Sequence, residues 1–181
     1  MIEVEVKYKV EEIEPIIKKL KEMNAEIEEE VIEEDHYFNH PCKDFRSTDE
    51  ALRIRIRGNS IELTYKGPKI SDKTKSRVEV SIVLNSPLDS ILKLLEHLGF
   101  TKVAVIRKHR KIYKLGDYKI SLDEVESLGN FVEIELRTQR ETLSDAELKV
   151  LVLARKLGLK GKPILKSYLE LFLEKELSTN R

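Results

Sequence analysis

Strict alternation of charged and aliphatic side chains in four segments is the feature that most constrains the fold of this chain. Successive side chains of a β-strand point to opposite faces, so each segment predicts a strand with one charged and one aliphatic face. The first segment opens the sequence, where charged residues at positions 3, 5 and 7 are separated by valines. The four charged faces are Glu3/Glu5/Lys7, Arg53/Arg55/Arg57, Arg77/Glu79 and Glu133/Glu135/Arg137.

The whole chain reads as strands interrupted by amphipathic helices, and no internal linker or repeat separates them. Period-two patterns and turn residues such as Gly58-Asn59 predict eight strands, most of them joined by connections short enough for antiparallel pairing. The predicted strands are 1–10, 25–40, 51–58, 60–67, 76–84, 100–115, 117–125 and 129–138. Apolar residues at helical spacing predict helices over 11–24, 86–99, 144–159 and 166–177.

Eight antiparallel strands can close into a barrel whose interior holds side chains or one small ligand. The helices need an apolar surface to cover, and the aliphatic strand faces supply it. The charged faces then point either to solvent on an open sheet or into a wet barrel interior, and periodicity alone leaves both open. We predict an α+β fold, with an eight-stranded antiparallel β-barrel and helices packed on its outside.

The distribution of charge favours the barrel interior over a solvated face. Carboxylates gather on the first and last of the patterned strands, and arginines on the middle ones. Three arginines on one strand face repel each other unless an anion binds there, and the planar guanidinium suits phosphate oxygens. Clustered carboxylates supply the oxygen ligands that Mg²⁺ or Mn²⁺ prefers. The sequence therefore predicts that the protein binds a nucleoside triphosphate or an inorganic polyphosphate. Basic side chains would hold its phosphates, and a metal ion would lie between the phosphates and the acidic side chains.

Overall composition bounds the remaining possibilities. The chain has 181 residues, enough for one domain with its own core. Its 33 Lys and Arg balance its 33 Asp and Glu, which argues against an extended nucleic-acid surface or a polybasic membrane binder. The one cysteine, Cys42, suits a reducing compartment, and no apolar run approaches the ~20 residues of a spanning helix. We expect a cytoplasmic protein without a membrane partner.

Residues 3–7, Glu-Val-Glu-Val-Lys, resemble the E-x-E-x-K signature of the CYTH superfamily, the triphosphate tunnel metalloenzymes. Further blocks follow in the family's order, and together they extend to about residue 170. The chain is thus identified as a member of this superfamily, with a single CYTH domain over 1–181. Its blocks are most similar to those of the class IV adenylate cyclase branch. The supporting blocks are DHYF, HPCKDFRSTDEALRIRIR, LTYKGP, SRVEVS, IRKHRKIY, SLDEVESLGNFVEIEL and KSY.

The resemblance implies a tunnel through the barrel and a requirement for Mg or Mn. Carried over by position, the metal-facing acids are Glu3, Glu5, Asp123, Glu133 and Glu135. The implied substrate-binding residues are Lys7, Arg53, Arg55, Lys66, Arg77, Lys108, Arg110 and Lys166. The members of this set expected to act in catalysis are Lys7, Arg53, Arg55, Lys66 and Arg110.

The cyclase branch implies conversion of ATP to 3′,5′-cyclic AMP and pyrophosphate. A tunnel triphosphatase that hydrolyses tripolyphosphate, thiamine triphosphate or a nucleoside triphosphate is the first alternative, with Tyr37 and Lys66 as candidates for handling the proton. A non-catalytic binder of polyphosphate or of RNA 5′-triphosphate ends is the second alternative. The family resemblance also favours a homodimer.

Two further expectations concern individual residues outside the motif set. Asp35 lies near the end of the predicted acidic strand and is a candidate for orienting an arginine inside the barrel. Ser144 precedes Glu147 by three residues, which is the pattern of a helix capping box.

Overall fold

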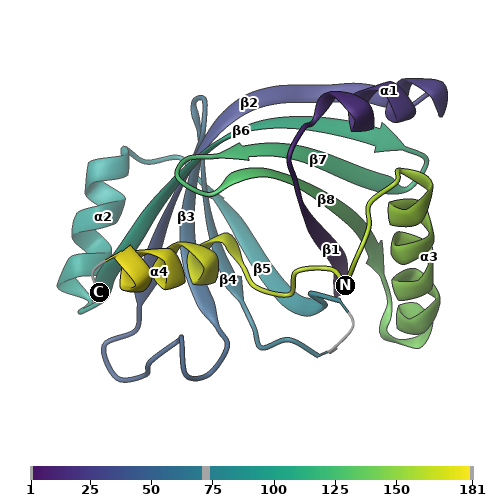
Figure 1. The fold of residues 1–181 in the computed structure, drawn as a ribbon. Helices are drawn as coiled ribbons and strands as arrows, with labels where there is room; N and C mark the ends of the chain where they lie inside the picture. The colour runs from purple at the N-terminus through teal and green to yellow at the C-terminus, as the bar shows by residue number, and fades with distance from the viewer. Residues whose placement is uncertain (1, 71–73, 180–181) are drawn as a thin grey trace.

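The computed structural model describes residues 2–70 and 74–179, and these residues form a closed antiparallel barrel with helices on its outside (Figure 1). The strand order around the barrel is β1-β5-β4-β3-β2-β6-β7-β8. This arrangement confirms the predicted fold class. The strands are β1 (Ile2–Val10), β2 (Glu26–Asn39), β3 (Ala51–Arg57), β4 (Ser60–Lys66), β5 (Arg77–Leu84), β6 (Thr101–Leu115), β7 (Tyr118–Val125) and β8 (Gly129–Thr138).

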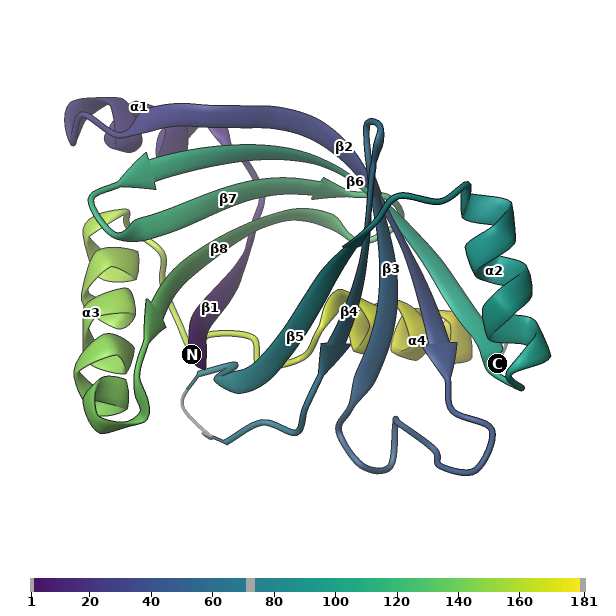
Figure 2. The same ribbon diagram turned by 180° about the vertical axis from the view of Figure 1, so that it is seen from behind.

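Four α-helices cover parts of the outer surface of the described barrel. Figure 2 shows two of them, α2 and α3, at opposite ends of the barrel. The helices are α1 (Glu14–Glu22), α2 (Leu88–His97), α3 (Leu143–Lys156) and α4 (Tyr168–Thr179). None of the described helices is both long and apolar enough to cross a membrane.

The main hydrophobic core lies between the barrel wall and the helices, where the sequence pattern predicts it. Val4 and Val6 of β1 point outward and are fully buried beneath Leu20 of α1 and Val150 of α3, in one cluster with Ile134 of β8. A second cluster packs α2 against β2 and β3, and a third packs the start of α4 against β2, β6 and β8. Outward burial of the aliphatic faces turns the charged faces inward.

The capping box predicted at Ser144 is wrong. A short 3₁₀ turn, Arg140–Thr142, runs directly into α3, so that Ser144 lies inside the helix and makes no cap bond. The Glu147 carboxylate accepts a hydrogen bond from the Thr74 hydroxyl at 3.1 Å. This contact joins α3 to the loop between β4 and β5.

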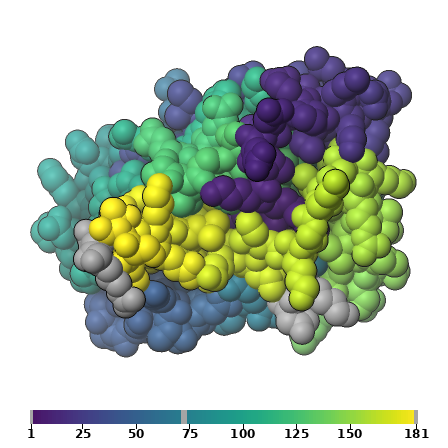
Figure 3. Space-filling model, in the orientation of Figure 1, coloured from purple at the N-terminus to yellow at the C-terminus, as the bar shows by residue number. Residues whose placement is uncertain are grey.

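The barrel closes through a short seam between its first and fifth strands. All of β1 pairs with β8, but β1 pairs with β5 only at Ile2 and Glu3. Beyond those residues, backbone carbonyls on the open edge of β1 accept hydrogen bonds from two other segments. The Lys75 amide donates to the Glu5 carbonyl at 2.9 Å, and the Ile164 amide donates to the Lys7 carbonyl at 2.7 Å. The segment that supplies Ile164 continues into α4, and Figure 3 shows both running across this face of the molecule.

Candidate active site

The inward strand faces enclose a cavity of about 790 Å³. Every strand of the barrel contributes side chains to its wall, and α4 and the loop between β2 and β3 add others at one end. Of the residues predicted from the sequence, all except Asp123 and Lys166 line this cavity, and the members present are Glu3, Glu5, Lys7, Arg53, Arg55, Lys66, Arg77, Lys108, Arg110, Glu133 and Glu135.

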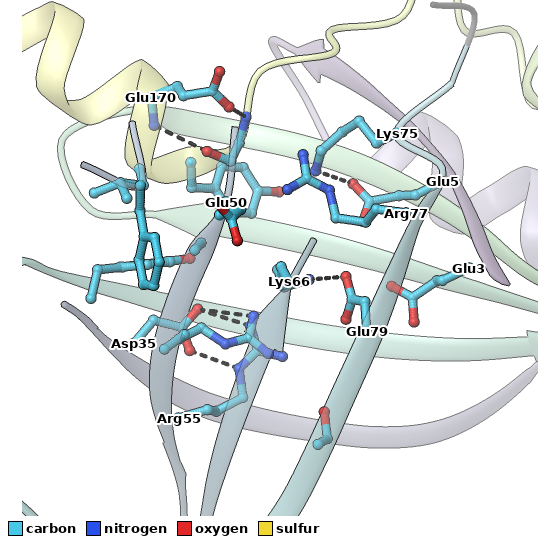
Figure 4. Close-up of a pocket in the computed structure, with 18 of the residues that line it drawn as sticks. Glu3, Glu5, Asp35, Glu50, Arg55, Lys66, Lys75, Arg77, Glu79 and Glu170 are labelled. Carbon is cyan, nitrogen blue, oxygen red and sulfur yellow. Dashed lines mark hydrogen bonds and ion pairs between the residues drawn. The ribbon is translucent and has the colours of Figure 1, made fainter. Parts of the chain in front are cut away.

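One side of the cavity carries a group of carboxylates that repel one another. Glu5 of β1 lies directly opposite Glu135 of β8 in the strand register, a like-charge pairing that is destabilising by itself. Burial, reinforced by the neighbouring charges of Glu135 and Glu79, raises the pKa of Glu3 to about 8. Figure 4 shows Glu3 and Glu79 side by side at this position. Basic side chains offset part of this charge, because Lys66 pairs with Glu79 and Lys75 with Glu5. Arg137 and Lys119 lie farther away, at 3.4 and 3.6 Å from Glu135.

A divalent cation fits the chemistry of this carboxylate group. Mg²⁺ and Mn²⁺ prefer carboxylate oxygens, and a bound cation would offset the burial and the repulsion that together raise the pKa of Glu3. Among the described residues, no three or more acidic, histidine or cysteine side chains already form a cluster that could hold a metal ion. The carboxylates would therefore have to converge when a cation binds.

A second group of acids is instead occupied by basic side chains. Asp35 receives two hydrogen bonds from Arg55, at 2.7 and 2.8 Å, and a third from Lys108 at 2.9 Å. Burial alone would raise the pKa of Asp35, but Arg55 and Lys108 hold it well below its usual range. The expectation that Asp35 orients an arginine inside the barrel is confirmed, as the paired side chains in Figure 4 illustrate.

Asp123 belongs to this occupied group and lies behind the cavity wall. Arg110 donates a bidentate pair of hydrogen bonds to the Asp123 carboxylate and a further hydrogen bond to Glu133 at 2.5 Å. The Tyr168 hydroxyl donates a further hydrogen bond to Asp123 at 2.6 Å. Asp123 therefore orients Arg110 in this structure, and a direct metal contact would require it to exchange that partner.

Lys7 is completely buried between the carboxylate groups and α4. Its ammonium nitrogen lies 3.2 Å from Glu133 and 3.6 Å from the centre of the Tyr168 ring. Burial, together with the charge of Lys75, lowers the pKa of Lys7 to about 7. Its ammonium also donates to the backbone carbonyl of Lys166. The Lys166 side chain does not line the cavity, is half exposed and pairs with Glu174 at the cavity rim.

Two buried guanidiniums in the cavity remain without close carboxylate partners. The nearest carboxylate oxygens to Arg53 are 3.8 Å away on Glu62 and 3.9 Å away on Asp35. Within the described residues the Arg53 Nε atom is buried without a hydrogen-bond partner. Among the described residues, Arg77 contacts the backbone carbonyl and the carboxylate of Asp49, each at 3.5 Å. Hydrogen-bond donors of buried arginines rarely stay unsatisfied, so this part of the cavity is prepared for an anion.

Lys75 is a basic residue of the site that the sequence reasoning missed. It lies in the loop before β5, part of which (71–73) falls outside the described residues. The Lys75 ammonium donates to the Glu5 carboxylate at 2.6 Å, and the side chain lines the cavity. The alternation of the strand pattern could have revealed it, since Lys75 lies two residues before Arg77 and so continues the inward-facing series of Arg77 and Glu79.

Comparison with known proteins shows which family this barrel and its cavity belong to. The model of the CYTH domain matches residues 1–168. The chain is similar to a Methanocaldococcus jannaschii protein named "Putative adenylate cyclase" (39% identical, covering 94% of this chain and 98% of the relative). It is also similar to the adenylate cyclase CyaB of Aeromonas hydrophila (30% identical, covering 87% and 81%). A solved structure of a Pyrococcus horikoshii OT3 protein superposes with a TM-score of 0.89 (42% identical, covering 96% and 99%).

Proposed function

Because the chain belongs to the CYTH domain family, we propose that it is a metal-dependent adenylate cyclase that converts ATP to 3′,5′-cyclic AMP and pyrophosphate. The names of its two relatives support the choice of reaction. The observation that carries the substrate class is the side chain of Arg53, which lines the cavity together with Arg77 and whose buried Nε atom has no hydrogen-bond partner among the described residues.

The basic side chains are proposed to hold the triphosphate. Among the described residues, the carboxylate oxygens nearest to Arg53 and Arg77 lie 3.8 and 3.5 Å away. Lys66 and Lys75, which pair with Glu79 and Glu5, add ammonium groups to the same cavity. Arg55, by contrast, is anchored on Asp35, so it presents positive charge in a fixed orientation. Charge fixed in advance costs little reorganisation during the reaction.

The acidic side chains Glu3, Glu5 and Glu135 are proposed to hold Mg or Mn, and Glu79 adds a fourth carboxylate to that side of the cavity. A divalent cation held there would lower the pKa of the attacking ribose hydroxyl and polarise the phosphoryl oxygens. Glu133, which pairs with Lys7 and Arg110, and Asp123, which is held by Arg110, would join the metal only by exchanging those partners.

The proposed reaction is an in-line displacement at the α-phosphorus of ATP. The ribose 3′-hydroxyl gives up its proton to solvent and its oxygen forms a bond to that phosphorus. The bond from the α-phosphorus to the bridging oxygen breaks, and pyrophosphate leaves. Negative charge grows on the pyrophosphate as this bond breaks, and Arg53 and Arg77 would stabilise it through hydrogen bonds that are stronger in the transition state.

Product analysis tests this function directly. Purified protein is incubated with ATP, and separately with tripolyphosphate, in the presence of Mg²⁺ or Mn²⁺. Cyclic AMP and pyrophosphate in equal amounts support the cyclase. Release of orthophosphate without cyclic AMP would make the protein a tunnel triphosphatase instead, and binding of either compound without any product would make it a non-catalytic binder. The Glu3→Gln/Glu5→Gln variant must lose the activity, while Lys166→Ala, which changes a side chain outside the cavity, must keep it.

The working form of the enzyme is proposed to be a cytoplasmic homodimer. The exposed thiol of Cys42 suits a reducing compartment. Val78, Val80 and Ile82 point outward from β5 and are each at least half exposed, which gives an apolar strip of the kind found at interfaces. Light scattering on the intact protein and on Val80→Lys tests the assembly, because a charge in a dimer interface should shift the mass to that of one chain.

A further inference from the structure

The cavity changes character towards the end at which β2 finishes. Along the inward face of β3, Arg55 and Arg53 are followed by Ala51, and inward residues on one strand are about 7 Å apart. Near Ala51 the wall combines acidic side chains, among them Glu50 and Glu170, with a set of apolar ones. We call the four larger apolar side chains there the apolar mouth, and they are Phe45, Val103, Leu169 and Leu173.

A β-bulge brings Val103 into the apolar mouth. In the pairing of β2 with β6, Tyr37 lies opposite Ala104 and Phe38 lies opposite Lys102, so Val103 is the extra residue between them. Bulges of this kind re-aim a side chain at the rim of a barrel. Val103 lines the cavity and remains 40% exposed, so its apolar surface is available to a ligand.

The start of α4 supplies the opposite side of the apolar mouth. Leu169 and Leu173 are four residues apart and therefore lie on the same helix face, and both line the cavity. Leu169 also packs against the hydrophobic cluster around Tyr168. Leu173 is half-buried and faces the cavity rather than that cluster.

Phe45 completes the apolar mouth and is held in a fixed position. Its backbone amide donates to the Asn39 side-chain carbonyl at 2.8 Å, and its ring packs edge-on against Tyr65 with 6.4 Å between the ring centroids. The Asn39 amide group in turn donates to Asp44 at 3.2 Å. The loop between β2 and β3 is thereby locked with an aromatic ring at the cavity wall.

We propose that the apolar mouth binds the base of a nucleoside triphosphate, with the triphosphate running inward from Ala51 to Arg53 and the carboxylate side of the cavity. The inference rests on the proposed function, since it requires the cavity to bind a triphosphate. A bare polyphosphate would leave Val103 and Leu173 in water, whereas a planar base would cover them. The mouth thus selects a nucleotide over an inorganic chain of phosphates.

Matched polar substitutions test the proposal. Leu173→Asn and Val103→Asn alter the mouth, and each has a control that changes an exposed apolar residue outside the cavity. Leu177, one turn further along α4, is 56% exposed, and Ile32 on the outside of β2 is 69% exposed. Affinities for ATP and for tripolyphosphate are measured by calorimetry with Ca²⁺ as the metal, under conditions in which no product forms.

Each mouth variant should bind ATP about tenfold more weakly and bind tripolyphosphate within twofold of the unaltered protein, because only the base loses its contact. The Leu177→Asn and Ile32→Asn controls should bind both compounds normally. Equal loss of affinity for both compounds, or no loss for either, would overturn the proposal. Its failure is distinguishable from failure of the cyclase assignment, because an enzyme that only hydrolyses ATP would still show the selective loss of ATP binding.

Discussion

Replacement of Asp35 by asparagine should destabilise the barrel strongly in the absence of ligand. The carboxylate is 1% exposed and holds Arg55 and Lys108 through three hydrogen bonds between 2.7 and 2.9 Å. The amide keeps the shape of the side chain but leaves two buried cations, Arg55 and Lys108, to share the carboxylate of Glu33, at 3.2 and 2.9 Å. Removing one partner of a buried ion pair costs about 3–5 kcal/mol of unfolding free energy. For a domain of this size that corresponds to a fall of roughly 6–20 °C in Tm.

Urea and thermal unfolding followed by circular dichroism measure this loss. Glu30→Gln is the control, because Glu30 is half exposed and pairs with His109 and Lys111 at the surface, where an ion pair contributes less than ~1 kcal/mol. Tripolyphosphate should narrow the difference in unfolding free energy between Asp35→Asn and the unaltered protein, since the added anion replaces the missing negative charge. A loss as small as that of Glu30→Gln would refute the idea that Asp35 balances these cations.

Three further predictions concern single side chains. Lys75→Ala should lower the rate of product formation about 100-fold, measured in the ATP assay, because it removes a cation that faces the cavity beside Glu5. Lys166→Ala should change that rate by less than about twofold, because its ammonium pairs with Glu174 in solvent. The folded-state pKa of Asp35 lies below its unfolded value near 4, so the stability it contributes is present above that pH and is lost on acidification. Urea titrations from pH 6 to pH 2 should show this loss, and Asp35→Asn should weaken the dependence.

Alternation was enough to predict the barrel wall because it is a property of single strands. The charged faces at Glu3, Arg53 and Glu133 all line the cavity, and the aliphatic faces between them are buried under helices. Whether those charged faces point to solvent or inward depends on the closure of the sheet into a barrel, which cannot be predicted from the pattern of any single strand. The motif resemblance supplied that information.

Partners across strands could not be predicted, because they depend on register. The sequence shows Asp123 as one more acid, but only the pairing of Arg110 with Asp123 across β6 and β7 reveals that its carboxylate is occupied. Lys75 escaped notice for a related reason. It lies in a polar loop and is placed by its backbone contact with Glu5, about 70 residues earlier in the chain.

The seam beside β1 has a consequence for the order in which the protein becomes active during synthesis. β1 emerges from the ribosome before the other strands, yet Ile164, which covers its open edge, and Arg137, its partner on β8, are made more than 130 residues later. Contacts so distant in sequence form late. Glu3, Glu5 and Lys7 therefore stay unassembled until the segment that carries Ile164 has emerged. A ribosome-bound nascent chain that ends before residue 164 would carry the signature residues of the site and yet be unable to act on a triphosphate.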